Sequence, residues 1–293
     1  MFKPGSMRSG SKQAAAACAL LLSASALGPT FAAPAPASAA TPLFTANGNT
    51  AWFPSRVAGD DFLPPDSGPG PVVSVKDHPY VPNGVGQSTY RVADLANPIL
   101  KPWAVEQMKH ANDNVLAGKI PFTARERCWP GGVPDFDIYE RDRPIFLLQT
   151  AKEVTIIEEH DQQVRHIFLN VPHSAHPKPS WYGESIGHYE GDTLVVDTIG
   201  MNDKTFVDNY RTPHTTELHV VERFRLIDGG KTLEAAITVA DPGAFNMPWS
   251  AVQRWRRNDS RSLGELVCAE DGGGYWQESF GLVPIPQAQK PDF

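Results

Sequence analysis

After Pro134 the chain alternates short apolar runs with turn-forming residues, which is the pattern of β-strands joined by tight connections. These runs are rich in β-branched and aromatic residues, and they predict eight or nine strands at 144–150, 153–160, 164–170, 183–190, 192–200, 216–227, 231–240, 248–257 and 263–269. Short sequential connections favour antiparallel pairing, and closing the sheet removes its exposed edges. The pattern therefore predicts a mainly β fold, an antiparallel up-and-down barrel, with a two-sheet sandwich as the alternative.

The front of the chain has a different pattern. Apolar residues recur at spacings of three and four over 97–118, which predicts one helix at about 102–116. Residues 41–87 are rich in Pro, Gly, Asp and Asn without a period, so we expect an arm that wraps the body or a linker. The predicted organisation is a signal peptide over 1–39, an extended arm over 40–94, a helix with a disulfide-anchored lead-in over 95–140, and the barrel with its C-terminal tail over 141–293.

The first 39 residues have the three parts of a secretory signal peptide. Lys3, Arg8 and Lys12 form a basic start, an apolar run follows over 14–27, and Ala37-Ser38-Ala39 offers a cleavage site. The run is shorter than the roughly 20 apolar residues that span a bilayer, which argues against a membrane anchor. We therefore expect a periplasmic or secreted protein, in which the remaining Cys128 and Cys268 pair as a disulfide.

Charge and missing motifs narrow the class of partner. The chain has 26 basic and 33 acidic residues, and loss of the three leader cations changes the net charge from −7 to 23 − 33 = −10. Such an acidic protein repels phosphate backbones, which argues against nucleic acid as a partner. The absence of a P-loop, a G-x-G-x-x-G fingerprint and a G-x-S-x-G elbow argues against nucleotide cofactors and a serine nucleophile.

Strand alternation indicates which polar residues point into the barrel. Glu222 shares a face with Val220 and Phe224, Asp197 shares one with Val195, and His166 lies between Val164 and Phe168; Trp249, Gln253 and Trp255 form another inward face. Polar groups among apolar walls favour a ligand cavity. The alternative is that the acids form structural ion pairs with Arg165, Arg223 or Arg254.

Histidines and acids are densest between residues 170 and 217. His173-x-x-His176 offers two imidazoles from one Pro-flanked loop, and a further side chain would complete a zinc or iron shell. The metal-free alternative pairs a histidine base with a carboxyl group, such as His166 or His188 with Asp197, Glu184 or Glu222.

Two sets of candidate residues follow. The catalytic candidates are His188, His214, Glu184, Asp197, Asp203, His166 and Glu222. The ligand-binding candidates are Trp181, Tyr182, Asn202, Arg223, Trp249 and Trp255, because aromatic rings offer flat apolar surface and the polar groups can orient a ligand.

One long stretch resembles a known family. Residues 180–204 read SWYGESIGHYEGDTLVVDTIGMNDK, and similar motifs continue at Pro213-His214, at 217–224 and at Asp241-Pro242. They resemble the signature of a large family of exported proteobacterial and acidobacterial proteins of uncharacterised activity, with Tyr189 and Met201 where members commonly have Trp and Phe. The resemblance implies a shared exported β fold and carries no catalytic role. By pattern analogy the barrel is also similar to lipocalin-like hydratases.

These observations predict an exported enzyme that acts on a small apolar or aromatic molecule by His/carboxylate acid–base chemistry, as a lyase, hydratase, isomerase or hydrolase. One alternative is a non-catalytic lipocalin-like carrier, in which the same groups orient a ligand. Another is a His-ligated metal-dependent enzyme. We expect no organic cofactor, and the predicted arm over 40–94 leaves open a homodimer in which it reaches into a partner.

Overall fold

The computed structural model describes residues 41–45, 50–55, 62–70, 72–74, 90–91, 99–117, 128–138, 143–160, 163–208 and 210–266. All of them belong to the second of two compact units, Ala39–Phe293. The predicted signal peptide and Cys268 lie outside the described residues, so the leader and the Cys128–Cys268 pairing stay predictions.

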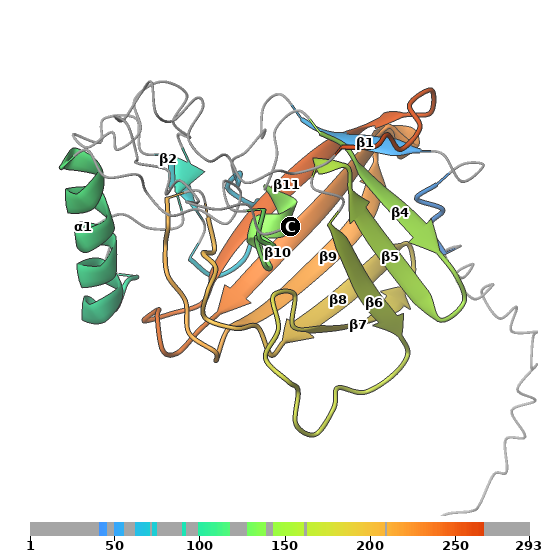
Figure 1. Cartoon of the computed structure of the whole chain (residues 1–293). Coiled ribbons are helices and arrows are strands. Elements are labelled where there is room, and N and C mark those ends of the chain that lie inside the picture. Colours follow the sequence, from blue (N-terminus) through green and yellow to red (C-terminus); the bar gives the residue numbers. More distant parts are fainter. Residues whose placement is uncertain are drawn as a thin grey trace, which may run out of the picture. The chain divides into compact units, whose positions relative to one another are not determined.

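A closed β-barrel forms the body of this unit, with nine strands in the order β1-β11-β10-β9-β8-β7-β6-β5-β4 (Figure 1). The strands are β1 (Ala51–Pro54), β4 (Ile145–Gln149), β5 (Glu153–Glu158), β6 (Val164–Leu169), β7 (Glu184–Glu190), β8 (Thr193–Ile199), β9 (His219–Ile227), β10 (Thr232–Ala240) and β11 (Trp249–Asn258). The predicted mainly β barrel is confirmed, and the two-sheet alternative is wrong.

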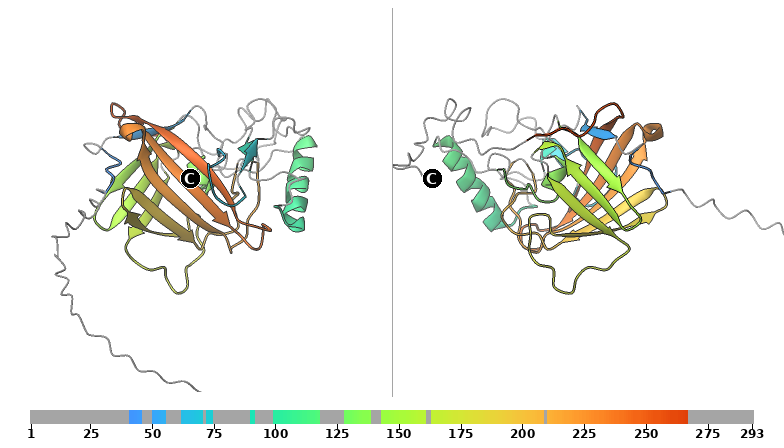
Figure 2. Two further views of the ribbon diagram at one scale, coloured as in Figure 1. Left: turned by 180° about the vertical axis from the view of Figure 1, so that it is seen from behind. Right: turned by 45° about the vertical axis from the view of Figure 1, so that its right-hand side comes forward.

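The barrel is mixed rather than wholly antiparallel, because β6 and β7 pair in parallel. A closed ring of antiparallel pairs needs an even number of strands, so nine strands require a parallel pair. Two parallel neighbouring strands need a long connection between them. Residues 170–183 form this crossover, which extends from the lower side of the barrel in the views of Figures 1 and 2. The prediction that all neighbouring strands are antiparallel is therefore wrong for β6 and β7.

The ninth strand comes from the predicted arm. β1 pairs with β11 on one side and β4 on the other, and so it closes the barrel. Further along the arm, Leu63 exchanges backbone hydrogen bonds with Val252, and the Val72 N–H donates to the Ser250 carbonyl. β2 (Val73–Ser74) and β3 (Tyr90–Arg91) form a separate two-stranded sheet. The predicted last strand, 263–269, has no strand in its described part, 263–266.

The predicted helix is present as α1 (Pro102–Leu116), the one α-helix of the described residues. Short 3-10 helices follow at η2 (Asp135–Asp137) and η4 (Asp228–Gly230). α1 lies outside the barrel wall, beside the connection between β10 and β11 (Figure 1). Within the described part of the chain, no helix is both long and apolar enough to cross a membrane.

The barrel interior is closely packed on the faces that β9 and β11 were predicted to turn inward. Glu222, Gln253 and Trp249 are fully buried, and Trp255 is 1% exposed. The two tryptophans are therefore core residues. Trp249 packs against Phe245 with ring centroids 6.2 Å apart.

Two predicted registers are wrong, and both errors turn a candidate residue outward. In β6 the inward residues are Arg165, Ile167 and Leu169, so His166 lies outside. In β8 they are Leu194, Val196 and Thr198, so Asp197 lies outside. In β6 the buried residue Arg165 is charged, so the inward face did not look apolar. In β8 the apolar residues 194–196 are consecutive, so alternation did not show which face points inward. An error of one residue assigns every side chain of a strand to the opposite face.

Candidate functional site

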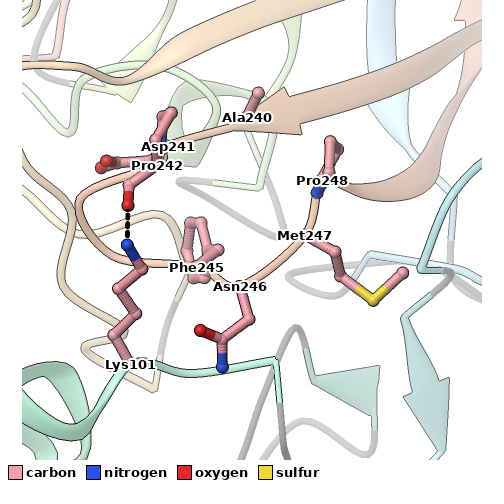
Figure 3. Close-up of a pocket in the computed structure, with 8 residues that line it drawn as sticks. All are labelled: Lys101, Ala240, Asp241, Pro242, Phe245, Asn246, Met247 and Pro248. Atoms are coloured by element: carbon pink, nitrogen blue, oxygen red, sulfur yellow. Dashed lines mark hydrogen bonds between the residues drawn. The ribbon is translucent and has the colours of Figure 1, made fainter.

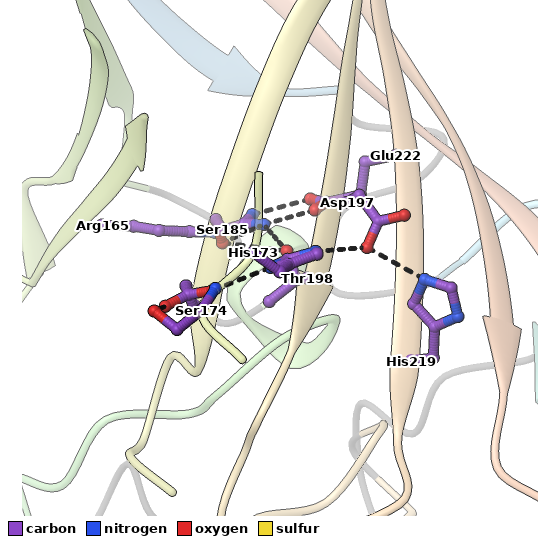
Figure 4. Close-up of polar contacts among 9 residues, drawn as sticks. Arg165, His173, Ser174, Ser185, Asp197, Thr198, His219 and Glu222 are labelled. Carbon is purple, nitrogen blue, oxygen red and sulfur yellow. Dashed lines mark hydrogen bonds and ion pairs between the residues drawn. The ribbon is translucent and has the colours of Figure 1, made fainter. Parts of the chain in front are cut away.

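Four outward side chains form a hydrogen-bonded chain across β7, β8 and β9 (Figure 4). His173, on the crossover, lies 3.0 Å by Nδ1 from Glu184 Oε1 and 2.9 Å by Nε2 from Asp197 Oδ1. The same Asp197 oxygen lies 3.0 Å from Nε2 of His219, the first residue of β9. One carboxylate therefore orients two imidazoles.

The crossover is attached to the wall through Glu184. The Ser174 N–H donates to Glu184 Oε1 at 2.6 Å, and the Ser174 hydroxyl donates to Oε2. These bonds, and then the neighbouring His173, lower the pKa of the Glu184 carboxyl. When both ring nitrogens carry protons, His173 donates to both carboxylates and bridges the crossover to β8.

His219 has the most exposed side chain of these four hydrogen-bonded residues. Its side chain is 43% exposed, and Asp197 accepts from Nε2, which leaves Nδ1 as the basic nitrogen of the neutral ring. Figure 4 shows that this nitrogen points away from Asp197. A histidine acts as a general acid or base when a carboxylate orients its ring through one nitrogen and a substrate can reach the other nitrogen.

A pocket of about 330 Å³ lies at the end of β10 and the turn that follows it (Figure 3). Its lining residues are Lys101, Ala240, Asp241, Pro242, Phe245, Asn246, Met247 and Pro248. Ala240 is the cross-strand partner of His219, and facing residues have Cβ atoms roughly 5 Å apart. The His219–Asp197 dyad and the pocket are therefore connected through Ala240, whereas His219 is not itself a lining residue.

Asp241 shapes the pocket floor by holding the turn after β10. Its carboxylate accepts from the N–H groups of Gly243 and Ala244 at 2.9 and 3.1 Å, and from the hydroxyl of Thr215 at 2.7 Å. The segment before α1 is bonded to the same turn, since the Lys101 N–H donates to the Ala244 carbonyl at 2.9 Å. The pocket walls are thus held by backbone hydrogen bonds.

No protein-family model matches this chain, and no curated protein matches it. The resemblance of residues 180–204 to a family of exported proteins stays a prediction.

A second polar group lies inside the barrel. Arg165 donates to Glu222 through both terminal nitrogens, one at 2.7 Å from Oε1, and also to Thr198 Oγ1 at 2.9 Å (Figure 4). Both charged side chains are fully buried. The structural ion pair considered for Glu222 is therefore present, with Arg165 as its partner, and it leaves Glu222 no route to solvent.

Asp137, at the end of η2, lies next to this ion pair. Its carboxyl accepts no hydrogen bond from the described residues. Burial, and then the negative charge of Glu222, raise its pKa well above the usual value. Asp137 is thus a buried acid that retains its proton at a higher pH than an exposed carboxyl group.

The other histidine pairings expected from the sequence have different partners. His166 binds Glu153, and His188 lies 3.1 Å from Glu190. Arg223 also binds Glu190, on the exposed wall. None of these contacts involves Asp197, Glu184 or Glu222, the acids with which the sequence pairs these histidines.

His214, a predicted catalytic residue, is buried and fully bonded. Its Nδ1 lies 3.0 Å from the Thr215 carbonyl, and its Nε2 lies 2.9 Å from Thr205 Oγ1. Burial lowers its pKa, so the neutral ring is favoured. These contacts indicate a structural role.

The remaining candidates lie on loops away from His219 and Ala240. Asn202 accepts from the Lys204 N–H at 3.0 Å, and Asp203 is exposed. Trp181 packs on Trp129 at 5.3 Å, and the Tyr182 hydroxyl donates to Gln163. His176 is exposed, and among the described residues no group of three or more His, Cys, Asp or Glu side chains is placed to hold a metal ion.

Sequence reasoning missed His219, Asp137 and Lys101. His219 stood on the face of β9 that was correctly predicted to point outward, so an outward Asp197 would have placed the two together. Asp137 and Lys101 carry no such signal, because Asp137 lies beside Glu222 and Lys101 beside residues 240–248, both distant in the sequence.

Proposed function

We propose that this chain is an enzyme that performs acid–base chemistry on a small apolar or aromatic molecule, with His219 as the group that transfers the proton. The observation that carries the proposal is the His219–Asp197 dyad, whose histidine is the cross-strand neighbour of Ala240 in the pocket lining. Lyase, hydratase, isomerase and hydrolase reactions all fit, because each needs a positioned proton acceptor or donor. The site lies on the outer wall, not in a barrel cavity.

Each of the hydrogen-bonded residues has its own role in this mechanism. Nδ1 of His219 takes a proton from water or from an acidic C–H of the bound molecule and later returns it. Asp197 is a positioning residue that holds the tautomer and stabilises the imidazolium. His173 holds Asp197 from the other side at 2.9 Å, and Phe245 and Met247 supply apolar surface for the substrate.

Hydrolysis of 4-nitrophenyl acetate tests the proposal, because this small aromatic ester needs only a base and water. We expect His219→Gln to lower kcat/KM by about 10² or more, since general acid–base catalysis contributes that much. Asp197→Asn should lower kcat with little change in KM, because it changes the orientation of the base and not the pocket.

His188→Gln is the matched control. His188 is also an exposed histidine on the barrel wall bonded to a carboxylate, and it faces Val195 and then Arg223, four residues along β9 from His219. Turnover in this variant should equal that of the parent chain. Equal turnover in parent and His219→Gln would refute the enzyme proposal.

The same variants distinguish an enzyme from a carrier. A carrier would bind the ester without turning it over, and His219→Gln would change its affinity by only a few fold. An enzyme keeps binding in His219→Gln but loses turnover.

We also propose, from the sequence, that the chain is exported and loses residues 1–39. The supporting pattern is the basic, apolar and small-residue leader. The intact mass of the protein recovered from the periplasm should correspond to a chain that begins at residue 40. Size-exclusion chromatography with light scattering then decides between monomer and homodimer.

A further inference from the structure

Lys101 places a positive charge at the pocket that no carboxylate of the described residues pairs with. Its side chain is half-buried, and its ammonium donates to the Pro242 carbonyl (Figure 3). Within the described residues it forms no ion pair with any carboxylate, whereas Lys109, in the helix α1 that follows it, lies 3.1 Å from Glu106. An ammonium has three donors, so Lys101 keeps hydrogen-bonding capacity for a ligand.

The acid in the pocket lining does not use that capacity. Asp241 is 2% exposed, and its two carboxylate oxygens accept four hydrogen bonds, from the N–H groups of Thr215, Gly243 and Ala244 and from the Thr215 hydroxyl, without Lys101 among the donors. Its carboxylate is therefore turned into the protein. The remaining lining includes the apolar side chains of Phe245 and Met247 and the amide of Asn246, whose Nδ2 donates to the Leu100 carbonyl at 3.2 Å.

We propose that the pocket selects an aromatic carboxylate, whose anionic group binds Lys101 and whose ring lies on Phe245 and Met247. This inference rests on the proposed function and names its substrate class. An unpaired ammonium at an apolar surface favours a ligand with one charged end, because a charge-assisted hydrogen bond is stronger than a neutral one. A volume of about 330 Å³ accommodates a single ring with its substituents.

Binding is tested with benzoate and with benzyl alcohol, its neutral counterpart. Met247 is 49% exposed and lines the pocket, so its methyl resonance in the methionine-labelled full-length chain reports occupancy, with Met247→Leu as the assignment. We expect benzoate to bind about tenfold more tightly than benzyl alcohol. Lys101→Met should abolish the difference, and Lys101→Arg should keep it.

Two further signals make the result decisive. Lys109→Met removes the same charge from α1 outside the pocket and should leave benzoate binding unchanged. The methyl resonances of the buried Met108 and Met201 show whether Lys101→Met is folded. Equal affinity for the two ligands, no shift of the Met247 methyl, or unchanged benzoate binding in folded Lys101→Met would overturn the proposal.

Activity provides the second test, with 4-acetoxybenzoate and its methyl ester as matched substrates. The carboxylate should raise kcat/KM about tenfold in the parent chain and not in Lys101→Met. If the anion preference is seen in binding but His219→Gln leaves hydrolysis unchanged, the proposed function fails and the anion site stands. If hydrolysis depends on His219 but both esters react equally, the substrate class fails alone.

Discussion

Asp137 shows how strongly the barrel interior changes the chemistry of a single side chain. An exposed aspartate titrates near pH 4, whereas burial and the Glu222 charge hold the pKa of Asp137 well above that value. Glu222, beside it, has a cation as its hydrogen-bonding partner, because Arg165 donates to both of its oxygens. Of the two neighbouring acids, only Glu222 is hydrogen-bonded to that arginine.

The raised pKa of Asp137 predicts a pH-dependent stability. From about pH 4 upward the unfolded chain loses this proton while the native protein keeps it, so the free energy of unfolding falls by about 1.4 kcal/mol per pH unit until the native pKa is reached. Asp137→Asn cannot ionise, and its free energy of unfolding should fall less between pH 4 and pH 8. Urea unfolding at pH 4, 6 and 8 measures both slopes, and identical slopes would show that Asp137 is ionised in the native protein.

Individual side chains were predictable where alternation was clear. Glu222 was correctly placed inside because Val220 and Phe224 flank it on one face. His166 was misplaced because Val164 and Phe168, at 39% and 47% exposure, are apolar residues on the outer surface. Hydrophobic residues on the surface are common, so an apolar pair does not by itself define an inward face.

Among the elements, β1 is the strand whose role in the barrel cannot be predicted from the local sequence pattern. It is a four-residue strand in a segment without a period, and it completes the barrel because β4 and β11 each leave an edge that it can pair with. Trp52 anchors it, with the ring fully buried and the indole N–H donating to the Phe44 carbonyl at 2.9 Å. Burial of this ring, not strand propensity, holds β1 in place.

Trp52→Ala should therefore destabilise the protein by about 3–5 kcal/mol, the usual effect of emptying a large aromatic site in a core. Denaturant unfolding followed by circular dichroism measures the loss. Leu43→Ala is the control, because Leu43 is 63% exposed in the same arm and should change stability by less than about 0.5 kcal/mol. A similar effect of both substitutions would mean that β1 does not close the barrel in solution.

The crossover 170–183 is the element that joins fold and site. The parallel pairing of β6 and β7 requires a long connection, and that connection carries His173 to the outer wall. An all-antiparallel barrel would have had a tight turn there, without room for this histidine. The site thus depends on an exception to the simplest topology.

For the whole chain, the predicted Cys128–Cys268 disulfide is the longest covalent constraint. The pairing stays a prediction, because Cys268 lies outside the described residues. The bridge would close a loop of 268 − 128 = 140 residues, and in the chain-entropy model such a loop adds roughly 4–5 kcal/mol.

Peptide mapping without reduction should recover the peptides of Cys128 and Cys268 as one linked species in protein purified from the periplasm. The double variant Cys128→Ser with Cys268→Ser should unfold at lower denaturant concentration. Recovery of both peptides with free thiols would contradict the pairing.

Positions of the helix and of eight strands followed from the sequence, because spacing, turn residues and alternation act between neighbours in the chain. Closure of the sheet followed as well, since edges must be removed. The parallel pair, the ninth strand and the partners of each histidine depended on contacts between distant segments. These features were determined by the closure of a nine-stranded ring, by the burial of Arg165 and by the register of β8. A local sequence pattern indicates none of the three.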